Sequence, residues 1–473
     1  MENNTHATQD NGRQPLNRRR FLATTTFAGA GLVLLSNEQS ARLHAQSAGV
    51  PTNRASGNAI NIAVVGCGAQ GQILLDNIDA IVKEKAINLK LKALCDIWPY
   101  QLQSSVNRQK SRGFADFQGY RDIDEMLEKE KSLDAVFVAT PDFLHAEHTN
   151  KSLKAGKHVY CEKMMANNIE NARSMVRTMK ETGKLLQIGH QRRSNPNYRY
   201  AYNVLLKQNK ILGRIMNANA QWNRAVATDL TMPKKGALTP EELKRAGFEN
   251  AHEFRNWRWF KKYSSGPISD LGAHQIDILN WVFGRPHSVI AAGGVDYYTT
   301  HEWYDNVMCI FDYKTPEGMA RAYYQVLTTT SSGGGYFENF MGLEGSLKLS
   351  EQSQHIKVYA ELASKDKFEA LAAKKILLAD TTPPAKAAKP SDGVADTRDT
   401  PPAAQFDLPS RTGAKMIHQF HVENFLKTVR GDPGVKLNCD GEHAFESEAP
   451  IFRVNEAVAA EKKLFYSDAD FAV

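Results

Sequence analysis

A glycine-rich turn at residues 66–71 has the spacing of a nucleotide-phosphate site. It reads Gly-Cys-Gly-Ala-Gln-Gly and directly follows the apolar run Ile60–Val65. Between a buried strand and a helix, the first glycine permits the tight turn and the second lets the backbone approach a pyrophosphate. The third lets the helix pack closely on the strand, and the helix N-terminus holds the phosphate charge. The predicted cofactor contacts in this turn are Gly66, Gly68, Ala69, Gln70 and Gly71.

An acidic residue further along indicates which dinucleotide the turn would hold. Asp96 directly follows the next apolar run, Leu89–Cys95. A carboxylate there accepts hydrogen bonds from a ribose 2′-hydroxyl and repels a 2′-phosphate. The sequence therefore predicts NAD as the cofactor, with NADP less favoured. A glycine turn without a nucleotide is the alternative.

Polar residues also follow two further strands of the same region. Thr140, Pro141 and His145 come at and after the run 134–140, and Glu162 and Lys163 follow the run 158–161. The carboxyl ends of parallel strands share one edge, where ligands bind in open α/β sheets. We expect these residues to line the cofactor groove, with the lysine at its mouth. No metal site is predicted, because His145 and His148 lack a third ligand at a suitable spacing.

A later group of residues has the spacing of an acid–base pair. Asp270, His274, Asp277 and Trp281 would lie on one face if the segment is a helix. An aspartate one turn from a histidine can tune the imidazole as a general base near neutral pH. A purely structural carboxylate–histidine pair is the alternative.

The elements that must position these residues fall into two regions. Strand-like and helical runs alternate over residues 58–195, which predicts an α/β fold with a doubly wound parallel sheet, a Rossmann domain. Over residues 196–473, strand-like runs follow one another with few helices between them. They predict a substrate-binding α+β domain with an open, mostly antiparallel sheet. Residues 376–411 are rich in Ala, Pro, Lys and Asp and predict an exposed low-complexity excursion.

The first 47 residues differ from the rest. Arg18-Arg19-Arg20-Phe21-Leu22 precedes a weakly apolar stretch, and Ala45-Gln46-Ser47 is a candidate cleavage site. This pattern resembles a twin-arginine signal, which predicts the export machinery as a partner and a periplasmic or otherwise exported protein. A disordered basic tail is the alternative. The longest uncharged apolar run, Phe21–Leu35, is too short for a stable membrane anchor.

Composition excludes several classes of protein and of binding partner. The chain is 42% hydrophobic and 23% charged, as is usual for globular proteins. Its five cysteines include no CxxC pair, which argues against a disulfide scaffold or a zinc ribbon. Its basic residues are interspersed with acidic ones and form no stripe with interleaved aromatics, so nucleic acid is not an expected partner.

Taken in order, these motifs resemble the glucose–fructose oxidoreductase/inositol dehydrogenase (Gfo/Idh/MocA) family. The resemblance covers nearly all of residues 60–465 and rests on AVVGCGAQG, VFVATPDFLHAEH, AGKHVYCEK, GHQRR, SDLGAHQID and MGLEGSLKL. It implies Lys163, Asp270 and His274 as the catalytic set. The sequence departs from the family at Met164, where proline usually follows the Glu-Lys pair. The candidate substrate contacts are Arg192, Trp257, Arg258 and Tyr336.

The resemblance implies hydride transfer between a nicotinamide cofactor and a hydroxyl or carbonyl of a sugar, polyol or glycoside. His274 would remove the hydroxyl proton, Lys163 would hydrogen-bond the same oxygen, and Asp270 would orient substrate and imidazole. An exported enzyme would have to hold its nucleotide tightly, because the periplasm offers little free NAD. An exported NAD-dependent glycosidase and a non-catalytic sugar or nucleotide sensor are the alternatives. The open sheet could pair with a second copy, so a homo-oligomer is expected.

Overall fold

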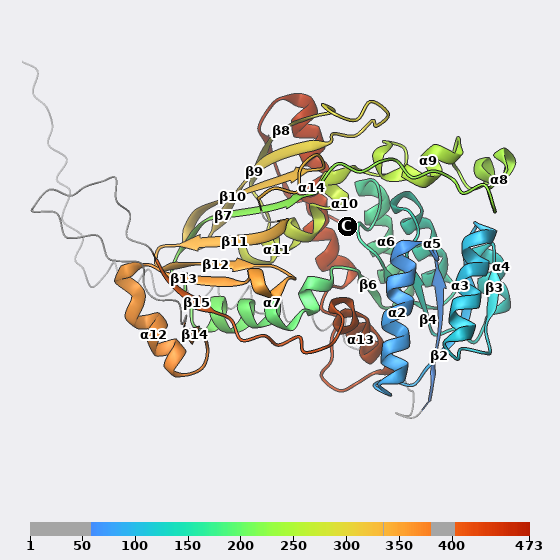
Figure 1. Ribbon diagram of the computed structural model, residues 1–473, viewed down its shortest axis with the longest axis horizontal. Helices are drawn as coiled ribbons and strands as arrows, with labels where there is room; N and C mark the ends of the chain where they lie inside the picture. The colour runs from blue at the N-terminus through green and yellow to red at the C-terminus, as the bar shows by residue number, and fades with distance from the viewer. Residues whose placement is uncertain (1–57, 334, 380–402) are drawn as a thin grey trace, which may run out of the picture. The chain divides into compact units, whose positions relative to one another are not determined.

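The computed structural model describes residues 58–333, 335–379 and 403–473, which build two β-sheets with helices packed on them (Figure 1). The predicted signal at residues 1–47 and most of the predicted excursion lie outside the described residues. No described helix is both long enough and apolar enough to cross a membrane.

The first sheet is parallel, with the strand order β3-β2-β1-β4-β5-β6. Its strands are β1 (Ile60–Val65), β2 (Leu89–Cys95), β3 (Gln118–Tyr120), β4 (Ala135–Val138), β5 (His158–Cys161) and β6 (Leu186–Ile188). The connecting helices are α2 (Ala69–Lys83), α3 (Pro99–Ser111), α4 (Ile123–Lys129), α5 (Asp142–Lys154) and α6 (Ile169–Thr182). Helices cover both faces, so β4 and β5 are buried throughout and their sequences do not alternate. The predicted doubly wound fold is confirmed.

The order of this sheet reverses between β1 and β4. The loops after these two strands therefore diverge to opposite faces of the sheet, which opens a crevice at their carboxyl ends. The glycine turn follows β1 and the Thr140 segment follows β4, so both lie at this crevice.

The second sheet has ten strands within the described residues, in the order β14-β15-β13-β12-β11-β7-β10-β9-β8-β16. Its neighbours run antiparallel except for β7 and β10, which are parallel. This confirms the predicted mostly antiparallel sheet. The strands are β7 (Ile215–Asn223), β8 (Ser288–Gly294), β9 (Asn306–Thr315), β10 (Gly318–Leu327), β11 (Tyr336–Gly342), β12 (Gly345–Leu349), β13 (Lys357–Ala360), β14 (Leu378–Ala379), β15 (Ala404–Asp407) and β16 (Leu464–Phe465).

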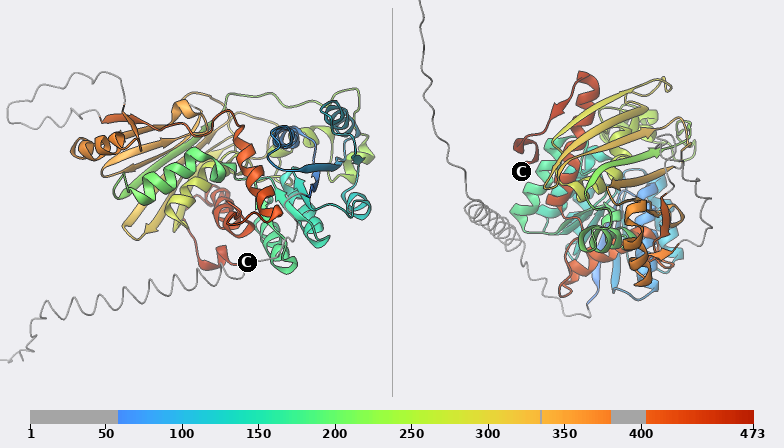
Figure 2. Two further views of the ribbon diagram at one scale, coloured as in Figure 1. Left: turned by 90° about the horizontal axis from the view of Figure 1, so that it is seen from below. Right: turned by 90° about the vertical axis from the view of Figure 1, so that its left-hand side faces the viewer.

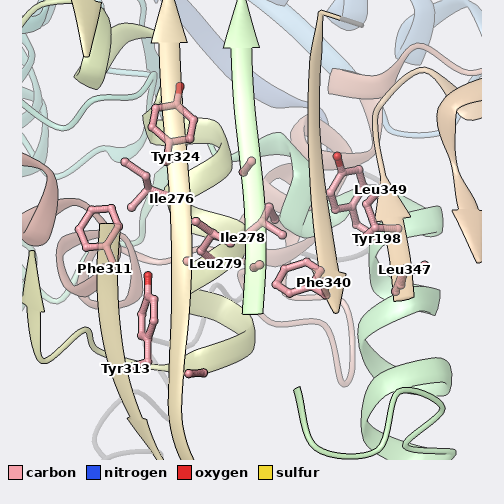
Figure 3. Packing of buried hydrophobic residues seen from close by; sticks show 14 of the residues in the cluster. Tyr198, Ile276, Ile278, Leu279, Phe311, Tyr313, Tyr324, Phe340, Leu347 and Leu349 are labelled. Atoms are coloured by element: carbon pink, nitrogen blue, oxygen red, sulfur yellow. The ribbon is translucent and has the colours of Figure 1, made fainter. Parts of the chain in front are cut away.

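One face of the second sheet carries the core of this half of the molecule. Ile276, Ile278 and Leu279 of helix α11 (Ala273–Phe283) pack on strand side chains such as Phe311 and Phe340 (Figure 3). The π-helix η2 (Ala201–Gln208) and helix α14 (Gly441–Ala460) add to the same apolar cluster. Figure 2 shows these helices from two further directions. The opposite face leaves Ile290, Met308 and Ile310 about two-fifths exposed, at 44%, 38% and 41%.

The two C-terminal helices return to the first sheet. Helix α13 (Ile417–Arg430) places the ring of Phe425 5.5 Å from that of Phe137 in β4 and 5.9 Å from that of Tyr160 in β5. Phe445 and Ala449 of α14 join the apolar cluster on the other face of the parallel sheet. The apolar core of the Rossmann half is therefore not complete at residue 195, where the sequence places the domain boundary. Side chains more than 200 residues further along complete its core.

The structure also corrects two local expectations. The expected helix from Asp270 to Trp281 is broken into α10 (Pro267–Asp270) and α11, with Leu271 and Gly272 between them. The ends of the expected excursion at 376–411 are not exposed coil, because Leu377 is fully buried and β14 and β15 join the sheet. The short segment of β3 and α4 had no clear pattern in the sequence. The remaining helices are α7 (Pro196–Tyr200), α8 (Pro240–Arg245), α9 (Ala251–Asn256), α12 (Lys365–Ala373) and α15 (Asp468–Phe471).

The packing of α13 predicts a specific loss of stability. Phe425→Ala should lower the free energy of unfolding by about 3–5 kcal/mol, because it leaves a cavity between Phe137 and Tyr160. Urea denaturation followed by circular dichroism measures this change. Phe465→Ala is the control, since that ring is 58% exposed and should cost about 0.5 kcal/mol. Equal effects of the two substitutions would contradict the assignment of α13 to the Rossmann core.

Candidate functional site

The glycine turn after β1 has the geometry of a phosphate cradle. Gly66 has φ +89°, and a Cβ atom there would lie 2.5 Å from the carbonyl oxygen of Ala139. A Cβ at Gly71 would overlap the Gly66 carbonyl oxygen, so this glycine allows α2 to pack closely on the turn. Gly68 is the N-cap of α2, and a Cβ there would meet nothing within 4 Å. The open space lies where a dinucleotide phosphate would reach the helix N-terminus, so the turn fits such a group.

Asp96 is held against this turn. Its carboxylate accepts the backbone N–H of Cys67 at 2.7 Å and that of Trp98 at 2.8 Å. Burial raises the pKa of Asp96 to about 6, and these two hydrogen bonds oppose the rise. The carboxylate therefore stands beside the turn, at the end of β2, where the sequence predicted a ribose contact.

The residues predicted from the ends of β4 and β5 divide into two kinds. His145 is fully buried, and its Nδ1 and Nε2 each lie 2.6 Å from a carbonyl oxygen, of Met164 and Thr140 respectively. Burial lowers the pKa of His145 to about 4. This histidine braces the two strand-end loops against each other and does not line the groove. Pro141, the N-cap of α5, and Thr140 stand half-buried at the groove edge.

Glu162 connects the end of β5 to the glycine turn. It is buried, and its carboxylate accepts the side-chain amide N–H of Gln70 at 3.0 Å. Ala69 and Gln70 open helix α2, so this contact fixes the first turn of that helix relative to β5. Glu162 therefore acts on the position of the cradle and of the next residue, Lys163.

Lys163, Asp270 and Arg258 meet at one point. The Nζ atom of Lys163 donates to the backbone carbonyl oxygen of Asp270 and lies 3.5 Å from its Oδ1 atom. The Nε atom of Arg258 donates to the same Oδ1 at 3.1 Å. Burial alone would raise the pKa of Asp270, but Arg258 and Lys163 outweigh it and hold that pKa at about 2. The aspartate is thus ionised at any physiological pH.

His274 lies in the first turn of α11, close enough to Lys163 for that charge to act on its imidazole. Its ring centroid lies 5.4 Å from that of Trp222 at the end of β7, and its buried Nδ1 has no hydrogen-bond partner among the described residues. Burial, followed by the charges of Lys163 and Arg192, lowers the pKa of His274 well below its usual value. The imidazole is therefore neutral and can accept a proton.

The expected pairing of His274 with an aspartate on its own helix is wrong. Asp270 precedes the break at Gly272 and binds Lys163 and Arg258 instead. Asp277 lies on α11 but forms an ion pair at 2.7 Å with Arg193, away from His274. The break turns the two segments relative to each other, so the spacing of four residues no longer places the two side chains together.

The candidate substrate-contact residues differ in how much of each side chain is exposed to solvent. Arg192 is fully buried, where Glu338 and Glu351 pair with its guanidinium, so it does not reach the surface of the groove. It instead supports the ring of Tyr336, whose centroid lies 5.4 Å from the guanidinium carbon. Arg258 is half-exposed and lies 4.3 Å from the ring centroid of Trp257.

Two residues of this site had no role assigned from the sequence. The ring of Trp222 lies 4.6 Å from that of Tyr336 in a tilted arrangement, and its other close ring neighbour is His274. A single tryptophan at a strand end carries no signal of these contacts in the sequence. Asp142 at the start of α5 is buried, and its Oδ2 atom lacks a hydrogen-bond partner among the described residues. Its position directly after Thr140-Pro141, at the end of a strand, is the sequence feature that could have identified it as a site residue. No cluster of three or more metal-ligand side chains occurs in the described part of the chain.

The cradle geometry predicts how a substitution at Gly68 acts. Because Gly68 has an ordinary φ of −67° and open space around its Cβ position, Gly68→Asp should change the free energy of unfolding by about 0.5 kcal/mol or less. A carboxylate beside the phosphate position should nevertheless weaken NAD binding about tenfold or more. Calorimetric titration with NAD and urea denaturation measure the two effects. Gly71→Ala, the contrasting variant, should impair both folding and binding, and a Gly68→Asp protein that binds NAD normally would contradict the cradle.

Sequence comparison gives matches in both halves of the chain. The model of the Gfo/Idh/MocA oxidoreductase family, NAD-binding Rossmann fold, matches residues 60–190, and that of the Gfo/Idh/MocA C-terminal domain matches residues 206–348. Together they span more than half of the chain. The scyllo-inositol 2-dehydrogenase (NADP(+)) of Bacillus subtilis is 24% identical over 50% of this chain and 54% of that protein. The 2,7-anhydro-N-acetylneuraminate hydratase of Escherichia coli is 30% identical over 36% of this chain and 39% of that protein. The chain thus spans about half the length of these relatives, or less.

Structural comparison extends over more of the chain. A levoglucosan dehydrogenase in complex with NADH aligns with 87% of this chain and 100% of its own, at 16% sequence identity and a TM-score of 0.63. At this identity the likeness concerns the fold. It agrees with the order of the two family matches and with a parallel sheet followed by a mostly antiparallel one. This chain belongs to the Gfo/Idh/MocA oxidoreductase family.

Proposed function

We propose that the protein is a nicotinamide-dependent oxidoreductase that acts on a CH–OH group of a sugar, polyol or glycoside. The observation that carries the proposal is that Lys163 donates to the backbone carbonyl oxygen of Asp270, four residues before the neutral imidazole of His274, at the crevice of a dinucleotide-binding fold. An uncharged base and a cation beside it suit the removal of a proton from a hydroxyl group. The relatives named for inositol and levoglucosan support this substrate class.

The cofactor site fits a nicotinamide dinucleotide. Gly68 and the start of α2 would take the phosphates, and Asp96 would take the ribose hydroxyls. When bound, the dinucleotide accepts or donates the hydride. The carboxylate of Asp96 favours NAD over NADP, although one relative is named for NADP(+). Comparing the dissociation constants of the two nucleotides tests this preference, and tighter binding of NADP would contradict it.

Each side chain around the substrate position would have a different role in the reaction. His274 takes the hydroxyl proton, and the Lys163 ammonium hydrogen-bonds the same oxygen and stabilises negative charge on it. Asp270 holds Lys163 and Arg258 in place, which makes it a positioning residue. The adjacent rings of Trp222 and Tyr336 would contact the C–H faces of a sugar ring.

A redox-neutral reaction is the second candidate. The relative named as a hydratase favours it, since a water molecule is added in such a reaction. The sugar would be oxidised, lose a leaving group, take up water and be reduced again, so that no net hydride is consumed. Release of an aglycone by protein that received no added NAD would favour this glycosidase-type reaction. A non-catalytic sensor is less favoured, since it would need no proton acceptor beside a lysine.

The roles of His274 and Lys163 predict a kinetic signature. His274→Ala should lower kcat by about 10²–10⁴-fold on an accepted sugar. In the wild type, the lowered pKa of His274 should keep the acid limb of the kcat/KM profile below the pH at which a free imidazole titrates. Lys163→Gln removes a positive charge near the imidazole, which raises the pKa of His274 and should move this limb to higher pH. An unmoved acid limb, or a His274→Ala variant with near-normal turnover, would contradict the assignment.

The basic, weakly apolar N-terminal segment leads us to propose export by the twin-arginine route. Folded export would load the nucleotide in the cytoplasm, and a retained nucleotide would then avoid the need for free NAD outside. Purified mature protein, denatured without added cofactor, should release close to one nicotinamide nucleotide per chain. A nucleotide-free supernatant, or activity only with millimolar NAD, would contradict retention. A reporter fused to residues 1–50 that stays in the cytoplasm would contradict export.

We also expect a homo-oligomer through the outer face of the second sheet. Ile290, Met308 and Ile310 expose apolar area on neighbouring strands β8 and β9. Two copies of this face could cover each other. Light scattering with an Ile310→Lys variant tests the pairing, because a charge on each copy should dissociate it.

A further inference from the structure

Basic side chains outnumber carboxylates at the candidate active site. Asp270 is the ionised carboxylate, and Lys163 and Arg258 both contact it. One carboxylate cannot neutralise two cations, and Arg258 keeps 47% of its side chain exposed. Its guanidinium uses Nε for Asp270, which leaves the terminal nitrogens for another partner.

Arg224 supplies a third cation. Its backbone N–H donates to the Leu327 carbonyl oxygen at 2.8 Å, so the chain is still paired with β10 one residue beyond the end of β7. In an extended chain the side chains of residues 222 and 224 lie on the same face, about 7 Å apart. Since Trp222 faces His274, Arg224 also projects on the His274 side. Arg224 contributes to lowering the pKa of Asp270, which agrees with this placement.

The Arg224 side chain is exposed and forms no hydrogen bond or ion pair with any residue of the described ranges. Counted with the buried cluster around Arg192, the site has four cations, Lys163, Arg192, Arg224 and Arg258, against three carboxylates, Asp270, Glu338 and Glu351. Burial raises the pKa of Glu338 to about 7, which reduces its negative charge further. Burial, and then the charge of Asp270, raise the pKa of Asp142 to about 8, so this carboxyl is mostly protonated at neutral pH. The open side of the site therefore carries excess positive charge.

We infer that the substrate is an anionic sugar, whose carboxylate or phosphate group binds between Arg224 and Arg258 while its reacting carbinol lies at His274. This inference rests on the proposed function and narrows its substrate class. Guanidinium groups bind carboxylate and phosphate in a bidentate manner, which gives orientation as well as affinity. The anion would place the ring over Trp222, next to the proton acceptor.

The test compares matched neutral and charged sugars on the holoenzyme. Glucose, glucuronate and glucose 6-phosphate differ at one carbon, and reduction of NAD is followed by absorbance. We expect kcat/KM to be about tenfold or more higher for one of the two anionic sugars than for glucose. The anion that is preferred distinguishes a carboxylate from a phosphate site. A preference for glucose over both anions would overturn the inference.

Two variants test Arg224 itself. Arg224→Gln should reduce the ratio of anionic to neutral kcat/KM about tenfold, mainly through KM. Arg214→Gln is the control, because Arg214 precedes the opposite end of β7 and is also exposed. It should leave the ratio unchanged. A ratio that Arg224→Gln does not change, or that both variants lower equally, would overturn the inference.

Binding separates this inference from the proposed function. Calorimetric titration of the NAD-loaded protein should show glucuronate or glucose 6-phosphate binding, weakened by Arg224→Gln and by about 0.5 M NaCl. Such binding without any turnover would contradict the proposed oxidoreductase while supporting the anion site. Turnover of sugars without any preference for an anion would support the oxidoreductase and overturn the anion site.

Discussion

The buried carboxylate of Glu448 joins the parts of the molecule that build the site. It lies in helix α14, accepts the backbone N–H of Met165 at 2.7 Å, and has its other oxygen 2.7 Å from Nε2 of His190. Met165 is two residues beyond Lys163, and His190 follows β6. A fully buried carboxylate without these partners would carry a large desolvation cost, so the three groups stay together. This one carboxylate, through two contacts, thus fixes the lysine loop, the end of the parallel sheet and the C-terminal helix relative to one another.

The same network continues to the helix that carries His274. Nδ1 of His190 lies 3.7 Å from Asp277, which pairs with Arg193 and accepts the Ser447 hydroxyl at 2.7 Å. Asp277 is one turn beyond His274 on α11. Lys163 and His274 come from different halves of the fold, so their separation depends on this chain of buried polar contacts. Nδ1 of His190 has no hydrogen-bond partner among the described residues, so its approach to Asp277 is the weakest link between the two ends of this network.

The cofactor side of the crevice is shaped by an aromatic cluster of the second half. Trp98, two residues beyond Asp96, donates its indole N–H to the Gly236 carbonyl oxygen at 2.6 Å. Its ring packs in one apolar cluster with Leu238, Phe248 and Tyr263. The segment containing α8 and α9 therefore leaves β7 and returns to the end of β2, where Asp96 is held. This arrangement gives the groove a rigid wall beside the residue expected to choose between NAD and NADP.

Local signals in the sequence were sufficient for the parallel sheet, the glycine turn and the strand ends that carry Thr140 and Lys163. These features depend on short-range rules: apolar runs for buried strands, glycine where φ is positive, and a helix after each turn. The sequence alone also supported the family and the choice of His274 and Lys163 as candidates. It could not show that Asp270 pairs with Lys163 and Arg258, because the break in the helix at Gly272 depends on how α10 packs. Nor could it place Trp222 beside His274, return Phe425 to the Rossmann core, or bring Glu448 to the backbone N–H of Met165. Those contacts join residues far apart in the chain, and only burial of the whole fold decides which distant side chains become neighbours.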